Sequence, residues 1–211
     1  MLNIDNFALD SNLGSPNKKY MAIWFHGCGR GCAGCIAQQR NNDPEPCFTF
    51  SPEFFARMIM TDKGRDVDGF VLSGGEPFLQ REDIVRFLSE AEKTAGRSLD
   101  VICYTGYKYE ELMSADSSAK ELLEHIDVLI DGEYRKELNN GSRYRGSSNQ
   151  NMIFLTKKYS VADFPDEYSR KITISSFDVI EMKGIPTEKS ETLWKAIKEE
   201  VDEYEEDNQG E

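Results

Sequence analysis

Four short apolar runs of the sequence each end in a loop that contains glycine, and this pattern constrains the fold more than any other feature. Between them lie stretches with helical spacing of apolar residues, at 51–62, at 81–96 and from about Tyr107 to His125. Near-continuous apolar strands that alternate with helices indicate a parallel sheet with helical crossovers. The sequence therefore predicts an α/β fold whose strands are YMAIWF (20–25), VDGFVLSGG (67–75), LDVICYTG (99–106) and IDVLIDG (126–132).

Three unusual loops follow these strands. The loop after the first strand is rich in cysteine and glycine, the second reads SGGEP (73–77), and the third reads YTGY (104–107). Ligands of an open α/β sheet bind at the carboxyl ends of its strands. We therefore expect the three loops to line one site.

Composition excludes several classes of function before any motif is considered. With 211 residues, 39% hydrophobic and 30% charged, the chain suits one globular domain with an appendage. A net charge of −13 argues against nucleic acid as a partner, because phosphate binding needs clustered Lys and Arg. No apolar run is long enough to span a membrane, and the first residues lack the pattern of a signal peptide. We expect a cytoplasmic protein in a reducing compartment.

The pattern changes after about residue 151. Residues 171–177 and 178–186 alternate as two strands, and 187–206 have the spacing of a helix that leads into an acidic tail. We therefore expect a core over 1–151 and a C-terminal extension over 152–211, made of a β-hairpin plus a helix. The extension is a candidate surface for recognising a substrate or partner.

Cys28, Cys32 and Cys35 follow the first strand as C-x3-C-x2-C, with glycines between them. Three kinds of site compete for this spacing. A structural zinc site needs a fourth Cys or His ligand, and the chain has no second close pair of cysteines. A redox pair of Cys32 and Cys35 leaves Cys28 unexplained. An iron–sulfur cluster held by three thiolates would keep one iron open for a substrate or cofactor, and the spacing alone makes this the favourite.

Glu76, in the SGGEP loop, offers a carboxylate that could bind a positively charged amine. The glycines before it expose backbone groups at the end of the strand. Considered alone, the loop is explained equally well as a glycine turn with a solvent-facing glutamate.

Five short motifs, in order over roughly residues 20–151, resemble the radical S-adenosylmethionine (radical SAM) superfamily. The similarity is closest to the activating enzyme of the anaerobic, class III ribonucleotide reductase. The motifs are the cysteine loop from Cys28 to Cys35, SGGEP (73–77), YTGY (104–107), LIDGEY (129–134) and YRGSSNQ (144–150). The resemblance implies a partial (β/α) barrel-like parallel sheet of the radical SAM type.

The resemblance also implies two cofactors and the residues that hold them. Cys28, Cys32 and Cys35 would bind a 4Fe–4S cluster, whose open iron takes the amino and carboxylate groups of S-adenosyl-L-methionine (SAM). Gly75 and Glu76 would hold the methionine amine. The other residues expected to contact SAM or a nearby cation are Gly34, Ile36, Thr105 and Asp131.

The chemistry that the resemblance implies begins with one electron from a flavodoxin or a ferredoxin. That electron would cleave SAM to methionine and a 5′-deoxyadenosyl radical, which would take hydrogen from a glycine Cα of a separate large reductase subunit. One alternative keeps the radical SAM core but acts on another protein, peptide or small molecule recognised through 152–211. A second alternative is a structural zinc or non-catalytic iron–sulfur binding module.

The sequence departs from the family pattern in three places. Ala33 stands where the family usually has proline, and Ile36 replaces the aromatic residue or histidine often found after the last cysteine. Typical short members also lack the extension over 152–211. These departures put the identity of the partner in question more than the chemistry.

Several conspicuous residues have simpler explanations. Cys103 lies inside an apolar strand and is expected to be a buried hydrophobe. Cys47 is not expected to be a ligand, because a fourth thiolate would block the open iron, and His26 is expected to make a loop hydrogen bond. Asn149, like the arginines near it, could face the partner, close the site or anchor its own loop.

Overall fold

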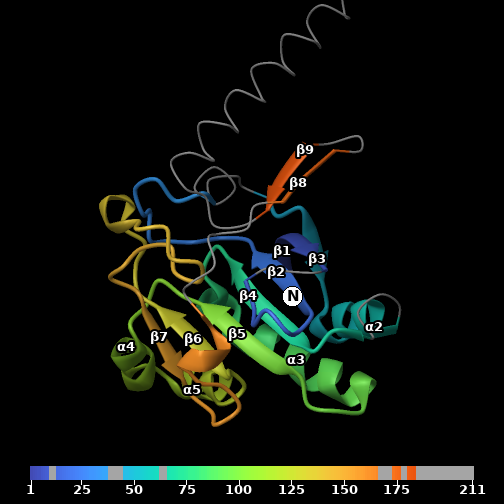
Figure 1. The fold of residues 1–211 in the computed structure, drawn as a ribbon. Helices are drawn as coiled ribbons and strands as arrows, with labels where there is room; N and C mark the ends of the chain where they lie inside the picture. Colours follow the sequence, from blue (N-terminus) through green and yellow to red (C-terminus); the bar gives the residue numbers. More distant parts are fainter. Residues whose placement is uncertain (10–12, 38–44, 62–65, 166–172, 177–179, 184–211) are drawn as a thin grey trace, which may run out of the picture.

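A computed structural model describes residues 1–9, 13–37, 45–61, 66–165, 173–176 and 180–183. Its centre is an open seven-stranded sheet with the order β3-β1-β2-β4-β5-β6-β7 (Figure 1). The four central strands run parallel, and the outer strands β1, β3 and β7 pair antiparallel with their neighbours. The strands are β1 (Leu2–Ala8), β2 (Tyr20–Phe25), β3 (Phe48–Phe50), β4 (Gly69–Gly74), β5 (Asp100–Tyr104), β6 (Val128–Asp131) and β7 (Asn151–Phe154).

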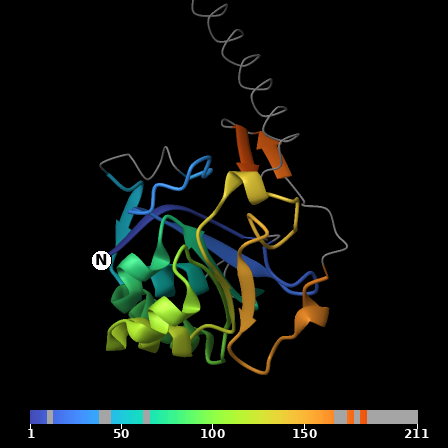
Figure 2. The same ribbon diagram turned by 90° about the vertical axis from the view of Figure 1, so that its left-hand side faces the viewer.

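Helices cover one face of this sheet (Figure 2). They are α2 (Pro52–Thr61), α3 (Arg81–Ala95), α4 (Tyr109–Ser114) and α5 (Ser117–Glu124). Short 3-10 turns are η2 (Pro77–Gln80), η3 (Lys136–Leu138) and η4 (Val161–Asp163). The larger part of the core fills the space between sheet and helices, where the rings of Phe70 on β4 and Phe87 on α3 lie 5.0 Å apart.

The second face of the sheet carries its own apolar layer. Tyr144, Tyr159 and Phe164 pack over side chains that β2, β4, β5 and β6 direct to this face. The ring centroids of Tyr144 and Phe164 are 5.1 Å apart. The segment that follows β7 is therefore part of the packed structure as far as Phe164.

Most expected elements are present, and the parallel arrangement of the four central strands is confirmed. The expected strand at 20–25 has those bounds, and α3 ends at Gly96, which takes the left-handed conformation of a helix cap with φ 65°. The helical stretch expected from about Tyr107 to His125 is present but is not continuous. It is divided into α4 and α5, because Ala115 leaves the helical conformation and the Asp116 side chain caps α5.

Two further expectations concern the strand directions of the sheet and the C-terminal extension. An all-parallel sheet is wrong at its edges, since β1, β3 and β7 were not expected and are antiparallel. The C-terminal hairpin is present as β8 (Thr173–Ser176) paired antiparallel with β9 (Ile180–Lys183). The helix expected at 187–206 lies outside the described residues. None of the helices described has the length and apolar character needed to cross a bilayer.

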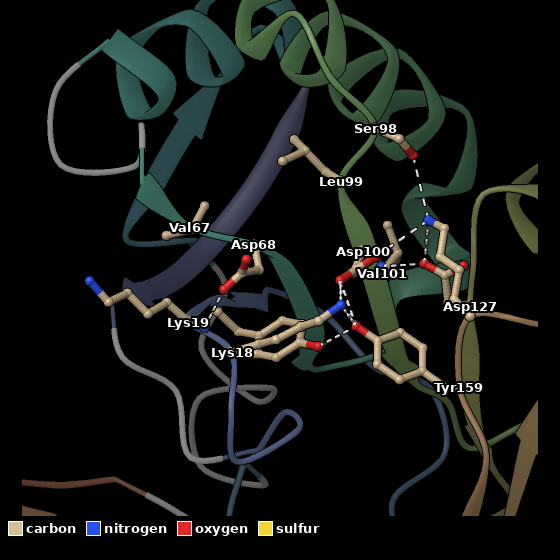
Figure 3. Close-up of polar contacts among 12 residues, drawn as sticks. Lys18, Lys19, Val67, Asp68, Ser98, Leu99, Asp100, Val101, Asp127 and Tyr159 are labelled. Carbon is tan, nitrogen blue, oxygen red and sulfur yellow. Dashed lines mark hydrogen bonds and ion pairs between the residues drawn. The ribbon is translucent and has the colours of Figure 1, made fainter. Parts of the chain in front are cut away.

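Six polar residues form a basal cluster at the amino ends of the central strands (Figure 3). The cysteine loop follows the opposite, carboxyl end of β2. The Asp100 carboxylate accepts hydrogen bonds from Lys18 Nζ at 2.6 Å and from the Tyr159 hydroxyl at 2.5 Å. Lys158 bridges two carboxylates, with Nζ 3.4 Å from Asp100 and 3.2 Å from Asp127. The members are Lys18, Tyr20, Asp100, Asp127, Lys158 and Tyr159. The cluster ties the segment after β7 to the sheet.

Candidate functional site

The cysteine loop leaves the carboxyl end of β2 and places three half-buried thiols within one short stretch. Gly31 and Gly34 have φ of 64° and 72°, a conformation that side chains other than glycine disfavour, so the loop can turn tightly between the cysteines. Burial raises the pKa of Cys28, Cys32 and Cys35. The negative charge of another thiolate of the three adds to each rise.

These donors suit an iron–sulfur cluster in chemistry and number. Within the part of the chain that the structure describes, no three Cys, His, Asp or Glu side chains converge on a single metal ion. In a four-iron cluster each thiolate binds a different iron. The donors therefore need to lie near one another, but they do not need to converge on one metal ion. Three thiols in one glycine-containing loop therefore fit such a cluster, with one iron left without a protein ligand.

Glu76 is buried at the end of β4, with 1% of its surface exposed. Its backbone N–H donates to the Gly27 carbonyl at 2.9 Å, so this loop is joined directly to the cysteine loop. The carboxylate accepts hydrogen bonds from Phe78 N at 3.1 Å, Thr105 Oγ1 at 2.9 Å and Gly106 N at 2.8 Å. The interpretation as a solvent-facing glutamate is therefore wrong.

The charge state of Glu76 reflects two opposing effects. Burial raises the pKa of its carboxyl group, while the hydrogen bonds from Gly106, Phe78 and Thr105 and the positive charge of Arg30 act in the opposite direction. The buried carboxyl group is thus held by one donor from its own segment, Phe78 N, and by two from the loop after β5, Thr105 and Gly106.

Thr105 and Asp131 both lie at carboxyl ends of strands, as expected, and both are buried. Thr105 accepts a hydrogen bond from Tyr107 N at 3.1 Å and donates its own to Glu76, so it orients the glutamate. Asp131 accepts from Tyr109 N at 2.8 Å and Asn151 Nδ2 at 2.8 Å, which joins the start of α4 to β7. Lys108 Nζ lies 3.4 Å from the same carboxylate.

Gly34 and Ile36 lie on the outer side of the cysteine loop. Ile36 is 59% exposed, and a Cβ added at Gly34 would approach the Lys136 side chain to 2.8 Å. A backbone hydrogen bond from Tyr134 lowers the pKa of Cys32 against the larger effect of burial. The segment that follows β6 therefore packs against the cysteine loop.

Residues 145–150 hold that segment in place. Gln150 accepts hydrogen bonds from Gly146 N and Ser147 N and donates Nε2 to the Gly132 carbonyl at 2.7 Å. Asn149 Nδ2 donates to the Glu133 carbonyl at 2.8 Å. Of the three roles considered for Asn149, these contacts favour the anchoring of its loop.

Two of the simpler explanations, those for Cys103 and His26, are confirmed, and the expectation that Cys47 is not a ligand stays a prediction. Cys103 is fully buried on β5, and Cys47 is an exposed free thiol beside β3. His26 Nδ1 lies 2.7 Å from Asp5 Oδ1, which confirms the expected loop hydrogen bond. Sequence reasoning missed Arg30, whose guanidinium lies over the Tyr107 ring with its carbon 4.6 Å from the centroid. Its only signal was a lone basic residue between two glycines and two cysteines.

Comparisons with known proteins identify similar chains. Residues 18–153 match a family model described as a 4Fe-4S single cluster domain. The chain is 35% identical over 136 residues to the anaerobic ribonucleoside-triphosphate reductase-activating protein of Enterobacteria phage T4. The aligned residues cover 63% of this chain and 81% of that protein. The chain is 32% identical over 133 residues to the protein of that name from Escherichia coli K12, covering 61% and 83%. The matched family region contains all three cysteines of the loop and Glu76.

Proposed function

This chain belongs to the family of anaerobic ribonucleoside-triphosphate reductase-activating proteins and carries the 4Fe-4S single cluster domain, and from that membership we propose that it activates a reductase of this class. The observation that carries the proposal is the cysteine loop, which lies beside the buried Glu76 carboxylate at the carboxyl edge of the parallel strands. This edge is where an α/β sheet binds its ligands. The open sheet would be the partial barrel of a radical SAM enzyme.

Cys28, Cys32 and Cys35 would hold the 4Fe–4S cluster, and SAM would bind beside it. When bound and reduced, the cluster supplies the electron that cleaves SAM to methionine and a 5′-deoxyadenosyl radical. Glu76 would bind the methionine ammonium group by charge and hydrogen bond, together with the Gly75 backbone. Thr105 would keep the glutamate oriented, through the hydrogen bond of 2.9 Å to its Oε1.

The remaining site residues have supporting roles in this proposal. Gly34 and Ile36 would lie near the adenine, where the exposed Ile36 side chain offers an apolar surface. Asp131 would line the nucleoside side or hold a nearby cation. Its carboxylate already orders the start of α4 through Tyr109 N, so any contact with the ligand would come from a prearranged group.

The proposed partners follow from the same chemistry. The hydrogen donor would be a glycine Cα in a separate large glycyl-radical reductase subunit, and the electron would come from a flavodoxin or ferredoxin. The proposed compartment is the reducing cytoplasm, where clustered cysteines bind metal more often than they form structural disulfides.

A second candidate function keeps the same core but changes the substrate. It is favoured by the hairpin of β8 and β9, which lies beyond the matched residues 18–153. In this proposal, residues 152–211 recognise another protein, peptide or small molecule.

The test begins with reconstitution of the full chain without oxygen, followed by dithionite, SAM and an assay for 5′-deoxyadenosine and methionine. We expect both products in equal amounts. Addition of a reductase subunit that carries a glycyl-radical segment should then give a glycyl radical signal in electron paramagnetic resonance. A colourless protein, or a cluster that never cleaves SAM, would contradict the proposal. SAM cleavage without a radical on any such reductase would support the second candidate.

A further inference from the structure

Arg30 extends from the cysteine loop across to the loop that follows β5. Its guanidinium lies over the Tyr107 ring, with the central carbon 4.6 Å from the ring centroid. This contact is a cation–π interaction, which favours a fixed position of the charge. One side chain thus connects the cysteine loop with the loop after β5, whose Thr105 and Gly106 donate hydrogen bonds to Glu76.

Gly106 makes room for this crossing. A Cβ at this position would lie 2.2 Å from Arg30 Cδ and 2.6 Å from Arg30 Nε, so any side chain there would displace the arginine. The N–H of the same glycine donates to Glu76 Oε2 at 2.8 Å. Arg30, the Gly106 backbone and the Glu76 carboxylate therefore lie next to one another in space.

Arg30 also keeps an unused hydrogen-bond donor. Its Nε is buried and has no hydrogen-bond partner among the described residues. A guanidinium stays protonated at any ordinary pH, and a buried donor without an acceptor is unfavourable. In the chain, Arg30 stands between Cys28 and Cys32, and its side chain lies against Gly106, whose N–H donates to Glu76.

We propose that Arg30 is a positioning residue that holds a positive charge where the cysteine loop meets Glu76, and that this charge favours reduction of the cluster. The inference rests on the proposed function, since it takes the three thiolates as cluster ligands. One-electron reduction adds a negative charge to a centre that already carries three thiolates. A cation held nearby stabilises the reduced form more than the oxidised form, because the attraction grows with the added charge.

The test compares reconstituted full-length Arg30→Gln, Arg30→Lys and wild-type proteins. The readouts are iron content and the midpoint potential of the cluster, from a redox titration followed by electron paramagnetic resonance. At a fixed applied potential, we expect the ratio of reduced to oxidised cluster in Arg30→Gln to fall about tenfold, which is a shift of about 59 mV to lower potential. Arg30→Lys keeps the charge but not the planar stacking, so it should recover part of the shift.

Arg57→Gln is the matched control. Arg57 lies on α2, is exposed, and pairs with Glu90 at 2.8 Å, so its loss should leave the potential at the wild-type value. Equal potentials for wild type and Arg30→Gln would overturn the inference while leaving the proposed function intact. A wild-type protein that never retains iron would overturn both.

Should Arg30→Gln fail to retain a cluster, Tyr107→Leu decides the question. This change removes the ring that fixes the guanidinium but leaves the arginine itself. We expect a shift to lower potential in Tyr107→Leu and a smaller one in Tyr107→Phe, which keeps the ring. An unchanged potential in Tyr107→Leu would overturn the inference.

Discussion

Glu76 combines two roles at the scale of a single residue. Its carboxylate accepts three hydrogen bonds from its own chain, which fixes the side chain, and both oxygens face backbone or hydroxyl donors. A carboxylate has about four lone-pair positions, so among the described residues one is left without a donor, and the proposed function assigns it to a ligand ammonium group. The residue is thus placed before any ligand arrives.

Glu76→Gln should weaken SAM binding and leave iron content near the wild-type value. The amide loses the negative charge and turns one acceptor into a donor that faces other donors. We expect the dissociation constant to rise about tenfold or more, which corresponds to roughly 1.4 kcal/mol. Anaerobic titration calorimetry of reconstituted protein measures it. Glu90→Gln on α3 is the matched control, and equal affinity in both variants would remove Glu76 from the site.

The cysteines allow a sharper comparison. Replacement of Cys28, Cys32 or Cys35 by alanine should each abolish the brown cluster, because each removes the ligand of one iron. Cys47→Ala should keep it, since Cys47 is exposed beside β3. Iron analysis and the visible absorption spectrum measure the outcome. Retained iron in any of the three loop variants, or its loss in Cys47→Ala, would contradict the assignment.

Sequence reasoning identified the cysteine loop because spacing and residue type are visible without coordinates. It left the environment of Glu76 open, because burial depends on Thr105 and Gly106 from another strand end. It missed Arg30 for a related reason. The meaning of that residue lies in its contact with Tyr107, which is distant in sequence and close only after the sheet forms.

At the scale of elements, prediction succeeded where one segment carries its own signal. The helix α3 has an apolar face and ends at a glycine, so both its existence and its end were predictable. The strand β1, which lies between β3 and β2, was not predictable, because LNIDNFA contains polar residues whose partners are remote. Asp5 within it is buried against His26, and a buried aspartate cannot be recognised before its partner is known.

The basal cluster gives the sheet a pH-dependent contact at its amino edge. Burial acts to raise the pKa of Asp100, but hydrogen bonds from Lys18 and Tyr159 outweigh it and hold the pKa below its usual range. An unfolded aspartate titrates at about 3.9. Since the folded pKa is lower, Asp100 stabilises the fold above about pH 4. That contribution is lost as the pH falls through the folded pKa.

Asp100→Asn should therefore lower the free energy of unfolding at pH 7 by about 1–3 kcal/mol, because it leaves buried donors poorly matched. The difference from wild type should shrink as the pH falls below about 4 and through the lowered pKa of folded Asp100. Urea unfolding of the iron-free protein, followed by circular dichroism, measures both effects. Asp66→Asn, at an exposed position, is the control. A difference that stays constant with pH would contradict the role given to the carboxylate.

Tyr159→Phe tests the hydrogen bonds of the same cluster. The change removes a hydroxyl that contacts Asp100 at 2.5 Å, Tyr20 at 2.7 Å and Lys18 at 2.9 Å. We expect a loss of about 1–3 kcal/mol in the free energy of unfolding at pH 7. Tyr109→Phe on α4 should change it by less than about 0.5 kcal/mol. Equal effects would show that the cluster adds nothing beyond ring packing.

At the scale of the whole molecule, two truncations separate packing from recognition. A chain ending at Pro165 keeps β7, Tyr159 and Phe164. One ending at Asn151 loses the pairing partner of β6 and, with Tyr159 and Phe164, most of the aromatic layer on the second face. We expect the first to fold and cleave SAM. The second should lose on the order of 5 kcal/mol or more, because several large buried side chains are removed.

Thermal unfolding and the SAM cleavage assay measure both truncated proteins. Loss of substrate turnover with intact SAM cleavage in the longer truncated chain would support recognition by the residues beyond 165. Stable folding of the chain that ends at Asn151 would contradict the importance given to the second face.

The amino and carboxyl ends of the central strands, which form two opposite edges of the sheet, are stabilised by different means. At the amino edge, the basal cluster joins strands and the segment after β7 through contacts that the chain supplies by itself. At the carboxyl edge, the proposed function gives the three thiols to the cluster, and the Nε of Arg30 has no hydrogen-bond partner among the described residues. Exposure to air should therefore remove iron from the protein without unfolding it. A protein that has lost its cluster would stay folded and could bind a new one. Recovery from oxygen would then depend on the supply of iron and sulfide and not on synthesis of new protein.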